Sequence, residues 1–574
     1  MKKNFVVYKS SAGSGKTTTL VKEYLKLSLT NPDNFRHILA ITFTNKAANE
    51  MKSRILEILT GMAAGHFPGN SHTETMAETG LSQEQMVTRA AELLHNITHQ
   101  YDEFAVSTID AFVHKIVRTF SADLKLPQGF EVLIDQDDII PYILEDMYDK
   151  LGKDPAFTEV LLHFALSQVE DEKSYDLNQN LTGFVKQQLN ETGNQADVLE
   201  QFSSSDFLIR IKQLQKNLNA GKTSIQKLAR ESLDRIREAG LCPADFKGGA
   251  KSSVGSYLLK ITQWQTKPHD LIPKPAVIKA IENDEWYAKS QEASIKARID
   301  ALTPALKENL QSIRDQVNRY VLLRLVYNNI YEMALTGEIR QLFKTFTERT
   351  RKVHISEFNK RIHKEIAGQP VPFIYERLGR RYRHFLIDEF QDTSLLQWSN
   401  LLPLIEESLA NGYFNLLVGD AKQAIYRFRQ GEVELFTHLP HLYGLEKTAE
   451  NRQRERILEQ NYHPKNLRTN YRSRQQIIDF NNRFFRLEGE HLGNDFRDVY
   501  EDVEQVPPDP PRPGGVVSID FIPAKNTEEF RTARKDKILE IVHELIDKQI
   551  PLRDICILTL KNSSAAALAS HLLE

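Results

Sequence analysis

A glycine loop near the N-terminus lies between a short apolar run and a helical pattern. It consists of Ser10, Ser11, Ala12, Gly13, Ser14, Gly15, Lys16 and Thr17. The two glycines let the backbone fold closely around an anion, and the amides of the following helix point at it. Lys16 adds a positive charge for the β- and γ-phosphates, and Thr17 offers a hydroxyl to Mg²⁺. Strand, loop and helix together predict an α/β fold that binds a nucleoside triphosphate.

Ser10 stands at the first position of the strict phosphate-loop pattern, where glycine is usual. The alternative is a glycine turn ahead of an ordinary helix. The Gly-x-Gly-Lys-Thr core is intact, and the apolar spacing after it is helical from Thr18 to Leu29. These features favour the phosphate loop, with Thr18 as the last residue of the predicted nucleotide-binding set.

Two adjacent acids, Asp388 and Glu389, follow the apolar run at residues 384–387. An acid at the carboxyl end of such a strand lies at the edge of an open α/β sheet, beside the glycine loop of a neighbouring strand. We therefore expect Asp388 to hold Mg²⁺ together with Thr17, and Glu389 to orient and deprotonate the attacking water. Two such acids are often a solvated turn, but the glycine loop upstream favours the catalytic interpretation.

The remaining patterns predict how the chain is organised. Residues 60–100 read as a loop with helical pieces, and residues 125–365 show mostly helical periodicity. We expect further strands at residues 37–43, 414–418, 516–522 and 555–560, with a helix between the last two. The order β-α-β, helical insertion and β-α predicts an α/β ATPase core interrupted by an inserted domain.

Composition limits the class of protein. Apolar residues make up 41% and charged residues 26%, as in a soluble globular protein. The net charge of −3 gives no global basic field, so any nucleic-acid binding must come from local patches. Two cysteines suit a reducing cytoplasm, and no apolar stretch approaches a membrane span. We expect a cytoplasmic protein with no membrane partner.

Four stretches resemble signature motifs of the UvrD/Rep-type superfamily 1 DNA helicases, in that family's order. They are residues 42–48 (TFTNKAA), 388–393 (DEFQDT), 419–429 (GDAKQAIYRFR) and 470–473 (NYRS). The Ser-Ala-Gly-Ser-Gly-Lys-Thr loop, the Lys-Gln-Ala-Ile-Tyr-Arg-Phe-Arg run and the long insertion look most like the AddA/RecB branch of helicase–nucleases. The motifs cover only residues 5–120 and 350–480, so the helical insertion is assigned by position alone.

The resemblance implies a RecA-like P-loop NTPase core with a large all-helical inserted domain and a partial second RecA-like domain. The first RecA-like domain would comprise residues 1–124 and 366–462, interrupted by the inserted domain at residues 125–365. Residues 463–574 would be the incomplete N-terminal part of the second domain.

The resemblance also implies residue roles. Gln423 would sense the γ-phosphate, Arg472 would reach it from the second domain, and Tyr471 would stack on the adenine. The path of the single strand would be lined by Phe43, Thr44, Thr108, Phe112, Tyr426, Phe428 and Arg429. Aromatic faces stack on any base, so such a path suits a motor that does not read sequence. For Phe112, on an apolar helix face, core packing is an equally good interpretation.

The sequence thus predicts an ATP- and Mg²⁺-dependent helicase or translocase on single-stranded DNA, 3′ to 5′ by resemblance. It would unwind duplex ends in recombinational double-strand-break repair, and the expected protein partner is a second helicase–nuclease subunit. The alternative is a nucleotide-gated DNA-binding subunit that does not unwind, but the intact Glu389 and Gln423 favour the motor. The family's closing arginine motif is not found here, so we expect these 574 residues to be the front portion of a longer protein. Alone, they should be weakly active or inactive.

Overall fold

The computed structural model divides into two units. The first contains Met1–Ser10 and Lys16–Asn466, and the second contains Ser11–Gly15 and Leu467–Glu574. The structure describes residues 3–67, 78–124, 126, 129–133, 136–170, 176–189, 199, 202–264, 271–354, 356–367, 373–427, 430–492, 497–500 and 504–573. No helix among them has the length and apolar content needed to cross a bilayer.

A six-stranded sheet forms the core of the first unit, with the strand order β3-β2-β6-β7-β1-β8. The strands are β1 (Phe5–Ser10), β2 (Ile38–Thr42), β3 (Val106–Thr108), β6 (His384–Ile387), β7 (Asn415–Gly419) and β8 (Tyr462–Leu467). The β1–β7, β7–β6, β6–β2 and β2–β3 pairs are parallel. Parallel strands are covered on both faces, and every residue of β2, β6 and β7 is buried. The predicted α/β core with strands near residues 37–43, 384–387 and 414–418 is confirmed.

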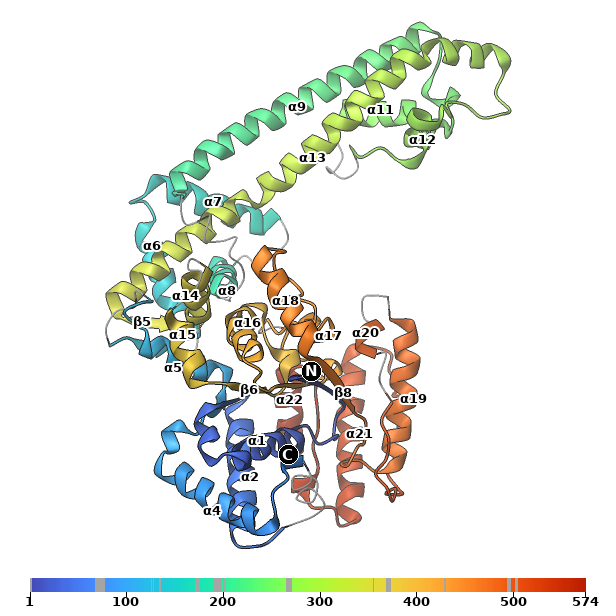
Figure 1. The fold of residues 1–574 in the computed structure, drawn as a ribbon. Coiled ribbons are helices and arrows are strands. Elements are labelled where there is room, and N and C mark those ends of the chain that lie inside the picture. The colour runs from blue at the N-terminus through green and yellow to red at the C-terminus, as the bar shows by residue number, and fades with distance from the viewer. Residues whose placement is uncertain are drawn as a thin grey trace. The chain divides into compact units, whose positions relative to one another are not determined.

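Helices cover this sheet. α1 (Lys16–Thr30) and α2 (Asn45–Ala63) lie on one side, and α16 (Leu395–Ala410) and α18 (Ala449–Asn461) lie on the other (Figure 1). The core also includes α5 (Ile109–Thr119), and α17 (Glu434–Thr437) packs near the turn after β6. Because the covering helices follow the carboxyl ends of parallel strands, the connecting loops gather at one edge of the sheet.

Residues 83–99 are more regular than the sequence suggested. They form a single helix, α4 (Gln83–His99), which begins with a capping box between Ser82 and Gln85. Four apolar residues on one face are fully buried, namely Met86, Ala90, Leu93 and Ile97. The sequence predicted only helical pieces here because polar residues outnumber apolar ones, yet spacing by three and four suffices for a buried stripe. Residues 68–77 of that predicted loop lie outside the described residues.

The region 125–365 is mostly helical, as expected, in the part that the structure describes. Its helices are α6 (Ile140–Lys150), α7 (Pro155–Glu170), α8 (Leu177–Leu189), α9 (Ser204–Glu238), α10 (Gly249–Ser252), α11 (Val254–Gln263), α12 (Pro275–Asn283), α13 (Ala293–Thr350) and the start of α14 (Ser356–Ala367). The two longest, α9 and α13, lie side by side in Figure 1. They contribute to two separate apolar clusters, one built around Phe157 and Phe346 and the other around Phe246 and Trp286.

A two-stranded parallel sheet, which the sequence did not predict, brackets these helices. β4 (Glu131–Leu133) pairs with β5 (Lys352–His354). The pair joins the two ends of the helical region, so the chain leaves the α/β core and returns to it at neighbouring points. α14 and α15 (Phe373–Arg381) then lead back to β6. The domain boundaries at 124, 365 and 462 stay predictions.

The second unit contains α19 (Gln475–His491), α20 (Arg497–Tyr500), α21 (Thr527–Asp547) and α22 (Asn562–Leu573). The helix expected between the last two strand patterns is confirmed as α21, but the strands predicted at residues 516–522 and 555–560 are wrong. Neither segment pairs with another, and the side chains of Phe521, Leu558 and Leu560 are at least 90% exposed. A segment becomes a strand only when a neighbouring segment forms hydrogen bonds with its backbone N–H and C=O groups. No described residue of this unit forms such a ladder with residues 516–522 or 555–560.

The packing beneath the sheet gives a stability prediction. Trp398 of α16 is 1% exposed and meets Phe390 edge-on, with 5.0 Å between ring centroids. Trp398→Ala should lower the free energy of unfolding by about 3 to 5 kcal/mol, because a large cavity opens beside the turn after β6. Urea unfolding followed by circular dichroism measures this. Leu322→Ala, at a side chain that is 65% exposed, is the control and should change stability by less than about 0.5 kcal/mol. Equal midpoints for both variants would contradict the packing described.

Candidate nucleotide-binding site

The glycine loop joins β1 to α1, as the sequence predicts. Gly13 and Gly15 have φ angles of +76° and +83°, a left-handed conformation that glycine adopts without a Cβ penalty. The Ser10 hydroxyl donates to the carbonyl oxygen of Gly419 at 2.7 Å, which ties the end of β1 to the end of β7. Serine at the position where the strict pattern has glycine therefore makes a defined contact between neighbouring strands.

The two acids lie where β6 ends. Asp388 is 6% exposed, and its backbone N–H donates to the carbonyl of Ile41 at 2.8 Å, continuing the ladder with β2. Its Oδ1 accepts the Glu389 N–H at 3.0 Å. Glu389 has a φ of +51°, which turns the chain sharply away from the strand. The strand thus ends with one buried carboxylate and one that turns toward Lys16.

Burial raises the pKa of Asp388 to about 7, and the neighbouring charge of Glu389 adds to the shift. Asp392 behaves similarly, since burial and Glu389 raise its pKa to about 6. These shifts mark a site with an excess of negative charge in a poorly solvated place, which a divalent cation would offset. Carboxylate and hydroxyl oxygens are the donors that Mg²⁺ prefers, so Asp388 and Thr17 fit the predicted metal role.

Three residues of the predicted site, far apart in the sequence, meet at the first residue of α1. The Lys16 ammonium lies 2.9 Å from Glu389 Oε2 and 3.4 Å from Gln423 Oε1. Only 12% of the Lys16 side chain and 31% of that of Glu389 are exposed, so solvent screens this ion pair less than it screens a surface pair. The structure therefore brings together the predicted phosphate-binding lysine, the predicted base and the predicted γ-phosphate sensor.

Gln391 and Asp420, which received no role from the sequence patterns, complete this group. The Gln423 amide donates to Asp420 Oδ2 at 2.6 Å, and Lys422 pairs with Asp420 Oδ1 at 2.9 Å. Gln391 donates to Glu389 Oε2 at 2.7 Å and accepts the Asp420 backbone N–H at 2.9 Å. Both residues lie within the sequence motifs described above, but Gln391 follows β6 and Asp420 follows β7. Their contact becomes visible only through the parallel pairing of β6 with β7.

The residues predicted to line the DNA path include an aromatic pair, two threonines that cap helices and two residues that the structure does not describe. Phe43 and Tyr426 are half-buried neighbours, with ring centroids 4.5 Å apart and a tilt of 37°. The Thr44 side chain caps α2 and that of Thr108 caps α5, by accepting the backbone N–H groups of Ala47 and Ala111. Phe428 and Arg429 lie outside the described residues.

Phe112 belongs to the core and not to a surface path. It is 3% exposed and contacts Tyr382 edge-on, with centroids 5.8 Å apart. A base can stack only on a ring that is exposed, so the burial of Phe112 favours a packing role for this residue. The other predicted residues of the path stay predictions.

Tyr471 and Arg472 belong to the second unit. Tyr471 is 56% exposed, and the backbone N–H of Arg472 donates to Asn470 Oδ1 at 2.9 Å. That asparagine is buried and also accepts the N–H of Ser473, so it fixes the turn that carries both predicted nucleotide contacts. Their roles toward adenine and the γ-phosphate stay predictions, as does that of the exposed Thr18 at the start of α1.

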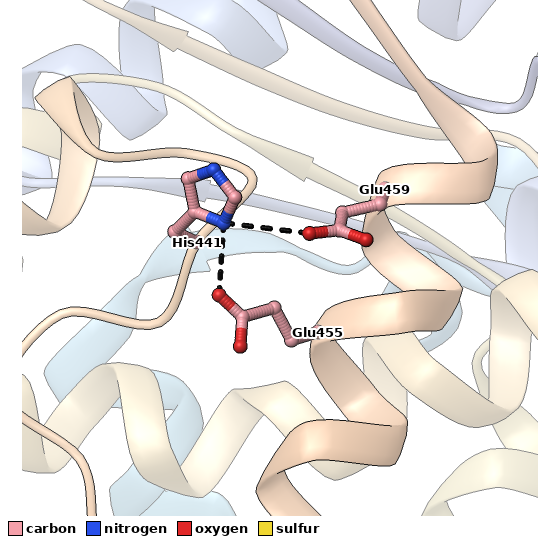
Figure 2. A group of neighbouring side chains, drawn as sticks. All are labelled: His441, Glu455 and Glu459. Atoms are coloured by element: carbon pink, nitrogen blue, oxygen red, sulfur yellow. Dashed lines mark hydrogen bonds and ion pairs between the residues drawn. The ribbon is translucent and has the colours of Figure 1, made fainter. Parts of the chain in front are cut away.

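One group outside this site has donors suited to a metal. Among the described residues, His441, Glu455 and Glu459 form the one such cluster, with ligand atoms within 4.8 Å of one another (Figure 2). His441 Nδ1 lies 2.9 Å from Glu455 and 3.4 Å from Glu459, and its side chain is 66% exposed. Figure 2 shows both carboxylates directed at the same ring nitrogen. We interpret the cluster as a surface polar contact that attaches the segment after α17 to α18.

Comparison with known families agrees with this geometry. A family model described as the UvrD/REP helicase N-terminal domain matches residues 1–444, more than half of the chain. The chain belongs to this family. In this UvrD/REP-type chain the match spans the glycine loop, the two acids and the Gln423 segment, and it includes the helical insertion.

Related proteins are named as subunits of an ATP-dependent helicase/nuclease. The protein from Clostridium novyi is 25% identical over 555 residues, which cover 90% of this chain and 41% of that protein. Those from Thermoanaerobacter pseudethanolicus and Streptococcus pneumoniae (strain ATCC 700669) are 25% and 23% identical, and the matches cover 91% and 97% of this chain and 42% and 45% of those proteins. The chain thus spans less than half the length of these relatives.

Lys16 gives a direct test of the site. Lys16→Ala should abolish MgATP binding in isothermal titration calorimetry while leaving the circular dichroism spectrum unchanged, because it removes the cation predicted to bind the phosphates. Lys26→Ala is the matched control, since this lysine lies on the same helix and is ion-paired with Glu23. Unchanged ATP affinity in Lys16→Ala would reject the site.

Proposed function

We propose that this chain is the ATP-driven motor portion of a DNA helicase that translocates along single-stranded DNA. The observation that carries the proposal is the meeting of Lys16, Glu389 and Gln423 at one edge of a parallel sheet. Each has a distinct task in phosphoryl transfer, namely charge neutralisation, water activation and γ-phosphate sensing. The family match and the names of the relatives support the same activity.

The geometry suggests how hydrolysis proceeds. A bound triphosphate competes with Glu389 for the Lys16 ammonium, because the phosphate oxygens carry more negative charge than one carboxylate. Once released, Glu389 accepts a proton from water as that water attacks the γ-phosphorus and the bond to the bridging oxygen breaks. Mg²⁺, held by Asp388 and Thr17, would neutralise charge on the phosphates. The products are ADP and inorganic phosphate.

The DNA contacts are proposed from the aromatic pair. Phe43 follows β2 and Tyr426 follows the Gln423 segment, so each ring is joined to the nucleotide site by a few residues of backbone. Stacking on bases is independent of sequence, which a stepping motor requires. Coupling between nucleotide and DNA would then pass along these short connections.

Further parts of the proposal rest on the resemblance alone. They are 3′-to-5′ polarity, action on duplex ends in recombinational double-strand-break repair, a cytoplasmic location and a partnership with a second helicase–nuclease subunit. The division into two RecA-like domains and a helical inserted domain belongs with them. A nucleotide-gated DNA-binding subunit that does not unwind is the second candidate, but the hydrogen bonds that orient Glu389 favour a hydrolysing enzyme.

Glu389→Gln tests the proposed hydrolysis. The amide cannot accept a proton, so single-turnover ATP hydrolysis by the protein at its natural full length should fall by about 100-fold or more while MgATP affinity is retained. Glu459→Gln, in the surface polar contact with His441, is the control and should leave the rate unchanged. If hydrolysis survives in Glu389→Gln, the base is another residue.

The aromatic pair gives a separate test. Phe43→Ala and Tyr426→Ala should each weaken binding to single-stranded oligonucleotides by about 1 to 3 kcal/mol, with little dependence on base sequence. Fluorescence anisotropy at fixed salt measures the affinity. Tyr443→Ala is the control, because this half-exposed ring contacts the His438 ring at a tilt and has no role in the proposed path. Equal affinities for all three variants would assign Phe43 and Tyr426 to packing.

A further inference from the structure

Gln391 is a buried amide that contacts two segments of the site at once. It is 1% exposed and lies in the short 3₁₀ turn η7 (Phe390–Asp392) after Glu389. Its Nε2 donates to Glu389 Oε2 at 2.7 Å and approaches Asp392 Oδ2 at 3.3 Å. Its Oε1 accepts the backbone N–H of Asp420 at 2.9 Å. One side chain thus links the end of β6 to the residue that follows β7.

The surroundings of Gln391 hold it in this position. Phe390, directly before it, is fully buried against Trp398. Gly419 lies so close that a Cβ there would stand 2.9 Å from Gln391 Oε1 and about as close to the ring of Phe436. A glycine at the end of β7 is therefore what lets the amide reach the Asp420 backbone. Such a confined side chain keeps its rotamer, and its partners are held with it.

The contacts of Gln391 close a ring. Glu389 Oε2 receives both the Gln391 amide and the Lys16 ammonium, and Lys16 reaches Gln423. Gln423 in turn donates to the side chain of Asp420, whose backbone N–H binds Gln391. Five residues from three chain segments thus share one continuous path of hydrogen bonds. A displacement of the Asp420–Gln423 turn must therefore either move the Glu389 carboxylate or break one of these hydrogen bonds.

We propose that Gln391 is a positioning residue for the ATPase reaction. It holds the Glu389 carboxylate in the orientation that water activation needs, and it makes that orientation depend on the position of the Asp420–Gln423 turn. The inference rests on the proposed function, because it assigns Gln391 a task in ATP hydrolysis at this same site. An amide suits the task because it donates to a carboxylate and accepts from a backbone N–H at the same time.

The first test replaces the amide by a side chain of similar length that has no hydrogen-bond donor and only a weakly accepting sulfur. Gln391→Met should slow single-turnover ATP hydrolysis by about 10- to 100-fold, since a small misplacement of a catalytic group costs that much. MgATP affinity should change by less than about twofold, because Gln391 acts on the chemical step and not on binding. Gln391→Glu is a second variant, which keeps the shape but places a negative charge against Glu389 and should give the same defect.

A double-mutant cycle separates positioning from general structural support. If Gln391 acts through Glu389, then Gln391→Met should cost nothing more in a Glu389→Gln background. Gln397→Met is the matched control, since Gln397 is also buried but bonds to Ser394 and Asp110 outside the ring. It should leave the hydrolysis rate unchanged even if it lowers the melting temperature.

The outcomes distinguish this inference from the proposed function. Absence of ATP hydrolysis by the unaltered protein at its natural full length would overturn the proposed function and this inference with it. Equal hydrolysis by the unaltered protein and by Glu389→Gln would reject Glu389 as the base, which overturns this inference and leaves the motor function standing. A slow Glu389→Gln together with a Gln391→Met that hydrolyses normally would overturn the inference alone. Additive losses in the double mutant would also overturn it, because they would show that Gln391 does not act through Glu389.

Discussion

The parallel register of β1, β7, β6 and β2 is the constraint on which the candidate site depends. Each of these strands ends at the same edge of the sheet, and the site residues follow those ends directly. The glycine loop, the acids and the Gln423 turn are far apart in the sequence. They meet because parallel pairing in this register leaves no other arrangement of the strand ends.

Electrostatics then determines how these residues arrange themselves. Three acids, Asp388, Glu389 and Asp392, share a poorly solvated edge, and burial raises the pKa of the first and third. Lys16 compensates part of this charge through its ion pair with Glu389. A site that binds a cation together with a polyanion needs this kind of incomplete compensation, since a fully neutralised edge would have little affinity for Mg²⁺.

The helical insertion illustrates how a large element can leave the core intact. The short β4–β5 pair brings the two ends of the insertion together, so the chain enters and leaves the insertion at neighbouring points. The helices bury apolar clusters of their own, separate from the cluster around the sheet. An element that satisfies its own packing adds little strain to the core that carries it.

The sequence by itself determined the α/β core, the glycine loop with Lys16 and Thr17, and the acids at the end of β6, because these depend on local patterns. It could not decide the partners of those residues. The contacts of Gln391 and Asp420, the burial of Phe112 and the β4–β5 pair depend on which strands and helices become neighbours. The segments at residues 516–522 and 555–560 show the same limit. Their apolar patterns favour strands, but a strand forms only when a neighbouring chain segment takes its backbone hydrogen bonds, and that is a property of the tertiary structure.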